Sequence, residues 1–189
     1  MPEIIQDINF KNEDFRVKSL SGKEYENCHF SNCNFSETDL SECIFSECEF
    51  ENCDLSMAIL KNTTLRETEF KNSKMMGLMF SNCNKFILSF SFENCILDFS
   101  SFFGCKIPKT SFKNCKMESV DFSEADISAS NFEKCGLESA VFENTKMQSC
   151  DFRSSYNYSF DPEKNGISGA KFSNPEVLRL LDKYKIVVE

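Results

Sequence analysis

The sequence contains no tryptophan, a single histidine and fewer basic than acidic residues. Its 21 lysines and arginines stand against 30 aspartates and glutamates, which leaves a formal net charge of −9. Proteins that bind nucleic acids normally carry a basic patch. The charge balance therefore argues against direct binding to DNA, RNA or an anionic membrane, and it is compatible with a partner whose surface is basic.

Long apolar segments and a leader peptide are also missing. No segment approaches the roughly 18 apolar residues of a membrane-spanning helix. The opening residues, MPEIIQDINFKNEDF, have no basic n-region and no long apolar run, so we expect no secretory signal. The eleven cysteines are odd in number and occur in a chain longer than the usual disulfide-rich scaffold. We therefore expect a cytoplasmic protein with reduced thiols and no membrane association.

The scarcity of histidine removes most catalytic arrangements. His29 lies at an outward position of a regular repeat, and the sequence has no Gly-rich phosphate loop, Ser-His-Asp set or histidine metal cluster. Paired carboxylates occur throughout the chain, so no single pair is distinctive. We expect no enzyme activity, no catalytic residues, no cofactor and no metal site.

What the sequence does contain is phenylalanine, 21 times, at a regular spacing. Large apolar residues recur at every fifth position from Ile5 to Phe80 and, two residues out of phase, from Ile87 to Phe152. A helix repeats every 3.6 residues and a strand every 2.0, so a period of five fits neither. Repetition at a fixed period indicates a repeat architecture.

The other positions of the five-residue unit are equally regular. The position two before each central residue is small, and asparagine is frequent two places after it, where it tolerates turn geometry. All eleven cysteines occupy the small position: Cys28, Cys33, Cys43, Cys48, Cys53, Cys83, Cys95, Cys105, Cys115, Cys135 and Cys150.

A square coil accounts for this pattern. Each five-residue unit forms one side and turns a corner, and four sides close a coil of about twenty residues whose neighbours pair like parallel strands. The central residue and the small residue point inward, and the other three positions face water. The fold class we predict is all-β, a quadrilateral parallel β-helix, and a rod with a filled core offers no deep pocket for a small molecule.

The coil does not account for the whole chain. We predict a repeat domain over residues 1–153, with a phase break near 81–86, followed by a connecting segment over 154–172 that is rich in turn-forming residues. Residues 173–189 should form a helix and a short strand. Asn174 can cap the helix, Pro175 suits its first turn, and Ile186 to Val188 favour a strand.

The repeat resembles a known family, the pentapeptide repeat proteins, in the stretches CNFSE, TDLSE, CEFEN, VDFSE and ADISA. The family's unit is a small residue, a polar residue, Leu or Phe, and two polar residues. The resemblance covers about residues 3–153 and implies that the coil is right-handed. Cysteine here often replaces the family's usual alanine, which changes little sterically.

The C-terminal stretch, from Asn157 to Glu189, resembles the end of the subgroup that includes quinolone-resistance and topoisomerase-poison immunity proteins. In that subgroup a terminal helix and strand cap the coil and build a twofold dimer. The resemblance implies a homodimer through the C-terminus, with contacts from Val177, Leu178, Leu181, Tyr184, Ile186, Val187 and Val188. Subgroup dimers are acidic rods that imitate duplex DNA, and several bind DNA gyrase or topoisomerase IV.

Acidic residues fall in columns on the expected coil. Asp98, Glu118 and Glu138 are spaced by twenty, so they stack at one outward position and repel each other. Asp121, Glu124 and Glu143 lie on the next face. Together these six form a candidate acidic strip for partner binding. The alternative is an ordinary solvated face, because charge runs commonly serve solubility. The column Glu93, Lys113, Glu133 and Arg153 instead alternates in sign.

The cysteines also stack in columns, such as Cys95, Cys115 and Cys135. One thiol per coil does not converge on a point as a zinc site requires, so we interpret these residues as core packing. The stacking distance would still permit disulfide formation under oxidation. Before the phase break, Met75, Met76 and Met79 give an adaptable apolar patch. Methionine serves both at adaptable binding surfaces and as core filler, and the central position assigns the core role only to Met75.

These observations support two functional hypotheses. The first is a non-enzymatic acidic protein that mimics DNA and modulates or protects a type II topoisomerase such as DNA gyrase, as in quinolone resistance. The second is a structural scaffold that binds an unidentified protein partner. A continuous negative strip across the dimer favours the first, and patchwork charge favours the second.

Overall fold

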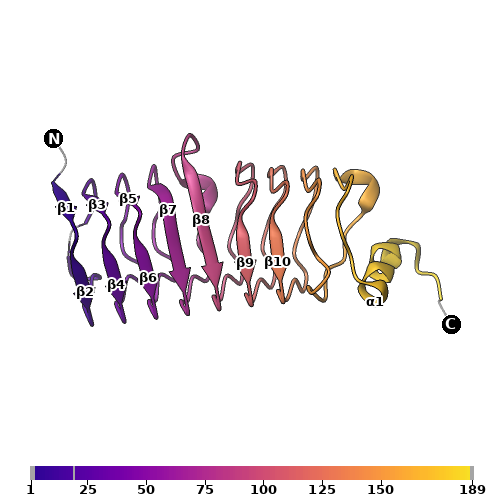
Figure 1. Cartoon of the computed structure of the whole chain (residues 1–189), viewed down its shortest axis with the longest axis horizontal. Helices are drawn as coiled ribbons and strands as arrows, with labels where there is room; N and C mark the ends of the chain where they lie inside the picture. The colour runs from indigo at the N-terminus through magenta and orange to yellow at the C-terminus, as the bar shows by residue number, and fades with distance from the viewer. Residues whose placement is uncertain (1–2, 19, 188–189) are drawn as a thin grey trace.

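The computed structural model describes residues 3–18 and 20–187, and it shows one long rod of stacked coils (Figure 1). The coils carry short strands: β1 (Ile4–Gln6), β2 (Asn9–Lys11), β3 (Glu24–Glu26), β4 (His29–Ser31), β5 (Ile44–Ser46), β6 (Glu49–Glu51), β7 (Thr64–Lys71), β8 (Leu88–Glu93), β9 (Ser111–Lys113) and β10 (Asn131–Glu133). The 3-10 turns η1 (Phe80–Asn82), η2 (Pro162–Lys164) and η3 (Leu178–Tyr184) and the helix α1 (Asn174–Val177) complete the described elements. The predicted parallel β-helix is confirmed.

All strand pairs are parallel and join residues one coil apart. Phe30 pairs with Phe50 between β4 and β6, and Phe112 pairs with Phe132 between β9 and β10. The offset is twenty residues along most of the rod, as the five-residue period predicts for a four-sided coil. Paired residues therefore occupy equivalent positions of neighbouring coils, where each central side chain stacks on its counterpart.

A continuous column of phenylalanine rings forms the centre of the core. Parallel rings follow one another with centroid separations of 4.7 to 5.6 Å. Members of the column are Phe10, Phe30, Phe50, Phe70, Phe92, Phe112, Phe132, Phe152 and Phe172. The separation matches the spacing of paired strands, so the backbone hydrogen bonds and the ring stack reinforce the same register.

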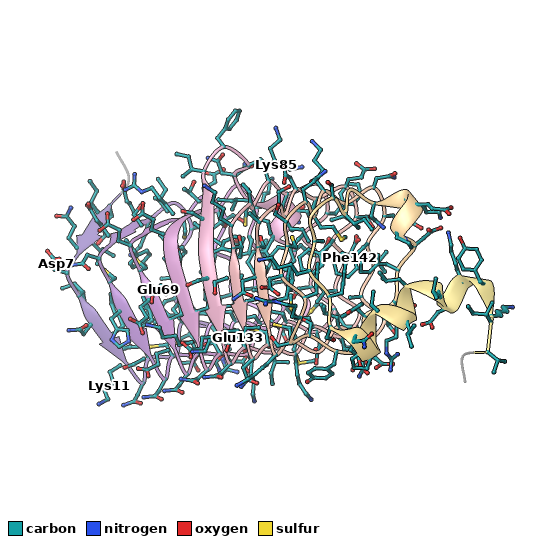
Figure 2. The ribbon with its side chains drawn as sticks, turned by 45° about the vertical axis from the view of Figure 1, so that its right-hand side comes forward. Asp7, Lys11, Glu69, Lys85, Glu133 and Phe142 are labelled. Carbon is teal, nitrogen blue, oxygen red and sulfur yellow. The ribbon has the colours of Figure 1, made fainter. Side chains whose placement is uncertain are left out.

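A second ring column stands beside the first in the C-terminal half. Phe80, Phe102, Phe122 and Phe142 stack at 4.5 to 5.3 Å. Its rings meet the first column edge to face, as Phe102 does with Phe112 at an interplanar angle of 85°. This geometry is favourable for aromatic pairs. Figure 2 places Phe142 within the coil, where it is buried.

The small position is confirmed as inward, and its side chains also donate hydrogen bonds. All eleven cysteines are buried and free. The thiol of Cys43 lies 3.0 Å from the carbonyl oxygen of Leu20, and the hydroxyl of Thr63 lies 2.8 Å from that of Leu40. Serine, threonine and cysteine thus fit the corner sterically and bind a carbonyl of the preceding coil.

The corners explain the asparagines that follow each central residue. Asn27, Asn32, Asn52, Asn62 and Asn72 all have φ between 49° and 56°. This left-handed region is unfavourable for most L-residues and is tolerated best by glycine and asparagine. Neighbouring asparagines also bond along the column, as when the amide of Asn94 donates to the side-chain oxygen of Asn72 at 3.0 Å.

The phase break lengthens one coil by two residues without disturbing the stack. Phe70 pairs with Phe92, an offset of 22, and the loop before β8 projects beyond the neighbouring turns (Figures 1 and 2). The expectation that Ile87 is a central residue is wrong, because its side chain is 48% exposed. Leu88 pairs with the central residue Leu65 in its place and packs against the core. Phe90, which is 7% exposed, pairs with Thr68 at the small position and lies beside the ring of Phe80.

Residues 154–172 continue the coil, so the connecting segment expected there is corrected. Parallel bridges join Gly136 to Tyr156 and Lys146 to Gly166. Tyr158 and Phe160 are buried in this last coil, although they do not follow the five-residue spacing. The turn-forming residues bend the chain within the coil and do not lead it away.

The C-terminal end differs from the expected helix and strand. Helix α1 starts at Asn174, so Ser173 is the residue at its N-cap position, and Pro175 lies in its first turn as predicted. The chain then tightens into η3, which ends where Lys185 adopts a φ of 52°. Ile186 and Val187 form no strand because no neighbouring strand pairs with them in the described part of the chain, and Val188 lies outside the described residues.

Truncation of a ring in the middle of the Phe column should destabilise the rod strongly. We expect Phe112→Ala to lower the free energy of unfolding by about 3–5 kcal/mol, because it opens a cavity between two stacked neighbours. Phe86→Ala, at a ring that is exposed on the projecting loop, should change it by about 0.5 kcal/mol or less. Guanidinium denaturation measures both, and equal shifts would contradict the role of the column.

The thiols should be inert in the folded protein and make it sensitive to alkali. Burial raises the pKa of Cys48 and Cys53 to about 12 and that of Cys43 to about 11, from an ordinary value of 9.0. The thiols' contribution to stability is therefore present below the ordinary pKa of 9.0 and is lost as the pH rises from there through about 11 to 12, because unfolding then releases thiol protons. DTNB titration at pH 8 should label the thiols only after denaturant is added. Rapid native labelling would contradict their burial.

Candidate functional site

The six residues of the candidate acidic strip lie on two adjacent faces of the rod, and their environments differ. The backbone N–H of Phe99 donates to the carbonyl of Glu118, and that of Ser119 donates to the carbonyl of Glu138. These bonds place Asp98, Glu118 and Glu138 at the same position of successive coils. The stacking that the spacing of twenty predicts is therefore present.

Asp98 is not an outward acid. Its side chain is only 9% exposed, and its Oδ1 accepts the backbone N–H of Glu118 at 2.9 Å. The carboxylate therefore serves the turn of the next coil. Asp98 lines the same surface depression as Glu118 and Glu138. The expectation that it presents a free charge to a partner is corrected, because a backbone donor one coil away engages its carboxylate.

Glu118 and Glu138 do face solvent. They line a shallow depression of about 240 Å³ together with Lys116 and Tyr156. Neither glutamate forms an ion pair with any residue that the structure describes. Lys116 belongs to the adjacent column, so its positive charge reduces the field of the two carboxylates.

The second face of the strip is also mixed. Asp121 is half-buried, and its Oδ1 accepts the backbone N–H of Ser123 at 2.8 Å. Glu124 occupies a corner with a φ of 58° and is exposed. Glu143 is exposed but pairs with Lys164 at 3.4 Å. Glu118, Glu124 and Glu138 are therefore the members of the strip that are exposed and lack an ion pair among the described residues.

The column of alternating sign is only partly paired. Lys113 lies 2.7 Å from Glu93, which lowers the pKa of Glu93 and raises that of Lys113. Arg153 turns to Asp151 of its own coil, at 2.7 Å, and thereby lowers the pKa of Asp151. Exposed ion pairs of this kind are screened by solvent, so the column adds little to stability.

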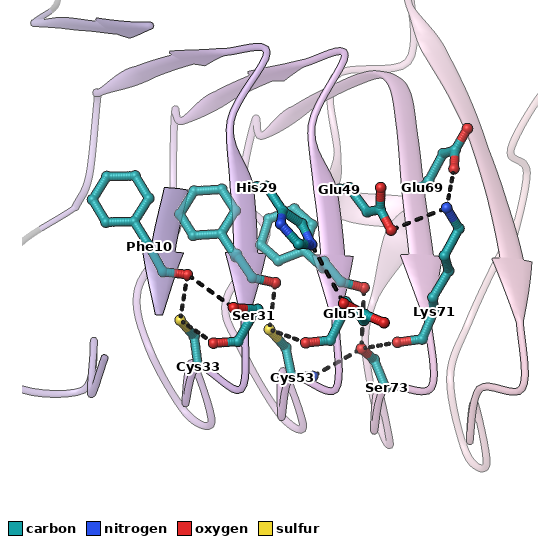
Figure 3. A network of polar contacts seen from close by, with 12 residues as sticks. Phe10, His29, Ser31, Cys33, Glu49, Glu51, Cys53, Glu69, Lys71 and Ser73 are labelled. Atoms are coloured by element: carbon teal, nitrogen blue, oxygen red, sulfur yellow. Dashed lines mark hydrogen bonds and ion pairs between the residues drawn. The ribbon is translucent and has the colours of Figure 1, made fainter. Parts of the chain in front are cut away.

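A second acidic cluster lies at another corner of the N-terminal half, and the sequence analysis missed it. Glu47, Glu49, Glu67 and Glu69 line a depression of about 280 Å³. Lys71 lies 3.0 Å from Glu49 and 2.8 Å from Glu69 (Figure 3), and these contacts raise its pKa. The same spacing of twenty that identified the C-terminal columns would have revealed this cluster.

His29 stands at the edge of the N-terminal cluster. Its Nε2 lies 3.6 Å from Glu51 (Figure 3), beyond hydrogen-bonding distance, and it has no hydrogen-bond partner among the described residues. Figure 3 also shows how Cys33, Cys53 and Ser73 bind carbonyl oxygens beneath this surface. The arrangement places structural polar contacts under a solvated, acidic exterior.

The residues expected at the dimer contact divide into two groups. Val177 packs against the core of the last coil, beside Leu180, which is buried and was not among the expected residues. Leu178, Leu181 and Ile186 line a shallow hollow at the end of the rod. Tyr184 and Val187 are exposed too, and Val188 lies outside the described residues.

The end of the rod is held to the coil by polar contacts. Lys183 lies 2.6 Å from Asp161 and 3.1 Å from Glu163, and the hydroxyl of Tyr184 donates to Glu163 at 3.1 Å. The pKa of Asp161 is lowered, chiefly by Lys183. The exposed apolar residues around η3 are therefore presented on a segment that is tied to the last coil.

The described residues offer little to a cofactor. The interior void among the core side chains, from Leu40 to Phe80, is about 10 Å³. No group of three or more His, Cys, Asp or Glu side chains within residues 3–18 and 20–187 has the geometry to hold a metal ion. In the same residues, no helix is long and apolar enough to cross a membrane.

Comparison with solved structures shows the same fold in QnrB1, described as a plasmid-mediated fluoroquinolone resistance protein. Two trypsin-treated variants match with TM-scores of 0.67 and 0.63, at 22% and 21% identity, over 97% and 98% of this chain and 99% and 100% of theirs. Full-length QnrB1 matches with a TM-score of 0.55 and 20% identity, over 97% of this chain and all of the other. No curated protein sequence matches this chain significantly.

The family is shown by the sequence match itself. The model of the pentapeptide repeat region matches residues 23–90 and 85–156, which together span most of the coil. The structure agrees with that match: its five-residue units stack, its small residues point inward and its corners are left-handed. The chain is a member of the pentapeptide repeat family.

Proposed function

We propose that this protein acts without catalysis, by binding a type II topoisomerase through its acidic surface, and that it modulates or protects that enzyme. The observation that carries the proposal is the exposed group Glu118, Glu124 and Glu138 on a rod of net charge −9. The likeness in fold to QnrB1 covers nearly all of both chains, and QnrB1 is described as a fluoroquinolone resistance protein. That description supports the choice of partner.

The physical basis is electrostatic attraction to a surface built for DNA. An enzyme that holds duplex DNA presents a basic groove, and exposed carboxylates about 4.8 Å apart along a rod attract such a groove. The attraction extends over a Debye length of about 8 Å at physiological ionic strength. Charge of this kind accelerates encounter and orients the rod.

The surface supports competition by charge and shape, without a position-by-position copy of DNA. Asp98 is withdrawn into a turn and Lys116 lies beside Glu118 and Glu138, so the negative strip is interrupted. The N-terminal cluster of Glu47, Glu49, Glu67 and Glu69 lies at another corner, where Lys71 pairs with Glu49 and Glu69. We therefore assign partner binding to the C-terminal glutamates and not to this cluster.

The C-terminal end suits contact with a second copy. Leu178 and Ile186 are exposed at the end of the rod, 45% and 57% respectively, and large apolar side chains at such a position gain free energy when covered. A twofold contact buries the same patch on both partners. We therefore propose a homodimer joined end to end, which would double the length of the acidic rod.

The second candidate function is a scaffold that binds another kind of protein. The interruption of the strip by Lys116 and the pairing of Glu143 with Lys164 favour it, because they produce the patchwork charge expected of an ordinary solvated surface. A scaffold would not depend on the exposed glutamates.

A charge-reversal experiment separates the two functions. We expect the wild-type protein to inhibit gyrase supercoiling, or to rescue it from a quinolone, and Glu118→Lys/Glu138→Lys to lose this effect because it removes the attraction to the basic groove. The matched control is Glu47→Lys/Glu67→Lys, which changes the net charge equally at another corner and should retain the effect. Absence of any effect of the wild type, at all ratios, would move the assignment to the scaffold.

The dimer has its own test. We expect Leu178→Asp/Ile186→Asp to sediment as a monomer of 21.8 kDa while the wild type sediments at twice that mass, since buried carboxylates oppose association. Val17→Asp, which alters an exposed residue in the first coil, should leave the dimer intact. A wild-type monomer at micromolar concentration would refute the end-to-end contact.

A further inference from the structure

Six large apolar side chains are exposed together near the middle of the rod. Their exposed fractions range from 36% to 61%. We call them the apolar patch: Met57, Ile59, Met76, Met79, Phe99 and Phe103. Single exposed apolar residues are normal on protein surfaces, but a contiguous group on one region marks an interaction site.

The register of the coil makes these residues neighbours. The backbone N–H of Met57 donates to the carbonyl of Met76 at 2.9 Å, and that of Gly77 donates to the carbonyl of Asp98 at 2.9 Å, directly before Phe99. The sulfur of Met57 occupies the space that a Cβ on Gly77 would take. Met79 bridges to Ser101, between Phe99 and Phe103. The patch thus spans consecutive coils without a gap.

Two members of the patch occupy backbone positions that do not suit them. Phe99 has a φ of 62° and Met57 a φ of 59°, in the left-handed region that is unfavourable for bulky L-residues. The same corner of neighbouring coils carries Glu37, Ser119 and Ser139 at similar φ. Phe99 is 57% exposed, so its ring gains little from burial in this chain. Its presence is not explained by the stability of the coil.

Acidic residues border the patch on both sides along the rod. Glu37 and Glu42 precede it at the corners, and Glu118, Glu124 and Glu138 follow it. None of the five forms an ion pair with a residue in the described parts of the chain. An apolar centre with a charged rim is the usual anatomy of a protein-binding surface.

We infer that the apolar patch is the anchoring point for a partner segment that places an apolar side chain between basic ones, such as one face of a basic amphipathic helix. Charge complementarity selects this occupant. A second copy of the chain would bring the same acidic rim against this one, and a nucleic acid would bring phosphates. The methionines adapt their shape to the inserted side chain.

The inference deepens the proposed function and rests on it where the topoisomerase is the partner. Binding by charge mimicry of DNA alone would involve no apolar contact. In the present inference, Phe99 anchors the enzyme and the glutamates form a charged rim around that contact. Truncation of a central aromatic anchor typically weakens binding more than loss of a rim charge does.

The test compares Phe99→Ser, which installs the residue found at this corner in the next two coils, with Val17→Ser, which alters an exposed valine in the first coil. The first probe is a helical Lys/Leu peptide of about 18 residues, beside a Lys/Ser peptide of equal charge. We expect Phe99→Ser to bind the Lys/Leu peptide about tenfold more weakly than the wild type and Val17→Ser do. The Lys/Ser peptide should not distinguish the three proteins.

Thermal unfolding provides the control for folding. Phe99→Ser should melt at the same temperature as the wild type or higher, because serine relieves the unfavourable backbone position. Weaker peptide binding by a variant of intact stability then reports loss of the anchor. Equal binding of the Lys/Leu peptide to all three proteins would overturn the inference.

The second probe is purified gyrase, which separates the two proposals. Tight gyrase binding by the wild type that is weakened by Phe99→Ser supports both the proposed function and the anchor. Tight binding that is unaffected by Phe99→Ser overturns the inference and leaves the proposed function standing. No binding to gyrase, with loss of peptide binding on Phe99→Ser, refutes the proposed function and supports the anchor. Self-association of the wild type that Phe99→Ser abolishes would identify a second copy as the occupant and overturn the inference.

Discussion

The structure depends on the stacking of each side chain on the residue one coil away. Parallel hydrogen bonds hold successive coils at the spacing of paired strands, and the same spacing suits parallel aromatic rings. Phe112 therefore pairs with Phe92 and Phe132 through the backbone ladder and stacks on the same two rings. The coil tolerates an insertion of two residues before β8 because the column resumes in register at Phe92. Unlike a globular core, this core is extended by repetition.

Stacking of residues one coil apart also arranges the exterior, where it brings like charges together. Equivalent outward positions stack into columns, so carboxylates in successive coils repel one another unless a hydrogen bond stabilises one of them. Asp98 accepts such a bond from the backbone N–H of Glu118, and Asp121 accepts one from that of Ser123. Longer glutamates at Glu118 and Glu138 remain in solvent. The acidic surface is therefore narrower than a count of acidic residues suggests, and an apolar patch interrupts it.

Membership in the pentapeptide repeat family settles the architecture and leaves function to the surface. Because the interior of the coil is filled, only its sides and ends are available for binding. The sides of this chain combine exposed glutamates with Met57 and Phe99, and its end presents Leu178 and Ile186. In the function proposed above, acidic charge brings a partner near and apolar side chains hold it.

The sequence by itself determined the coil, the inward position of every cysteine and the turns at asparagines two places after a central residue, because inward and outward directions repeat with every five residues. Only the tertiary structure decided what each outward side chain touches. Asp98 turns toward a donor supplied by the next coil, and Leu88 takes the central position expected for Ile87 where the period is broken. Tyr158 is likewise buried in the last coil although it is off the five-residue spacing. Where the repeat is irregular, contacts with the neighbouring coil determine which side chains are buried.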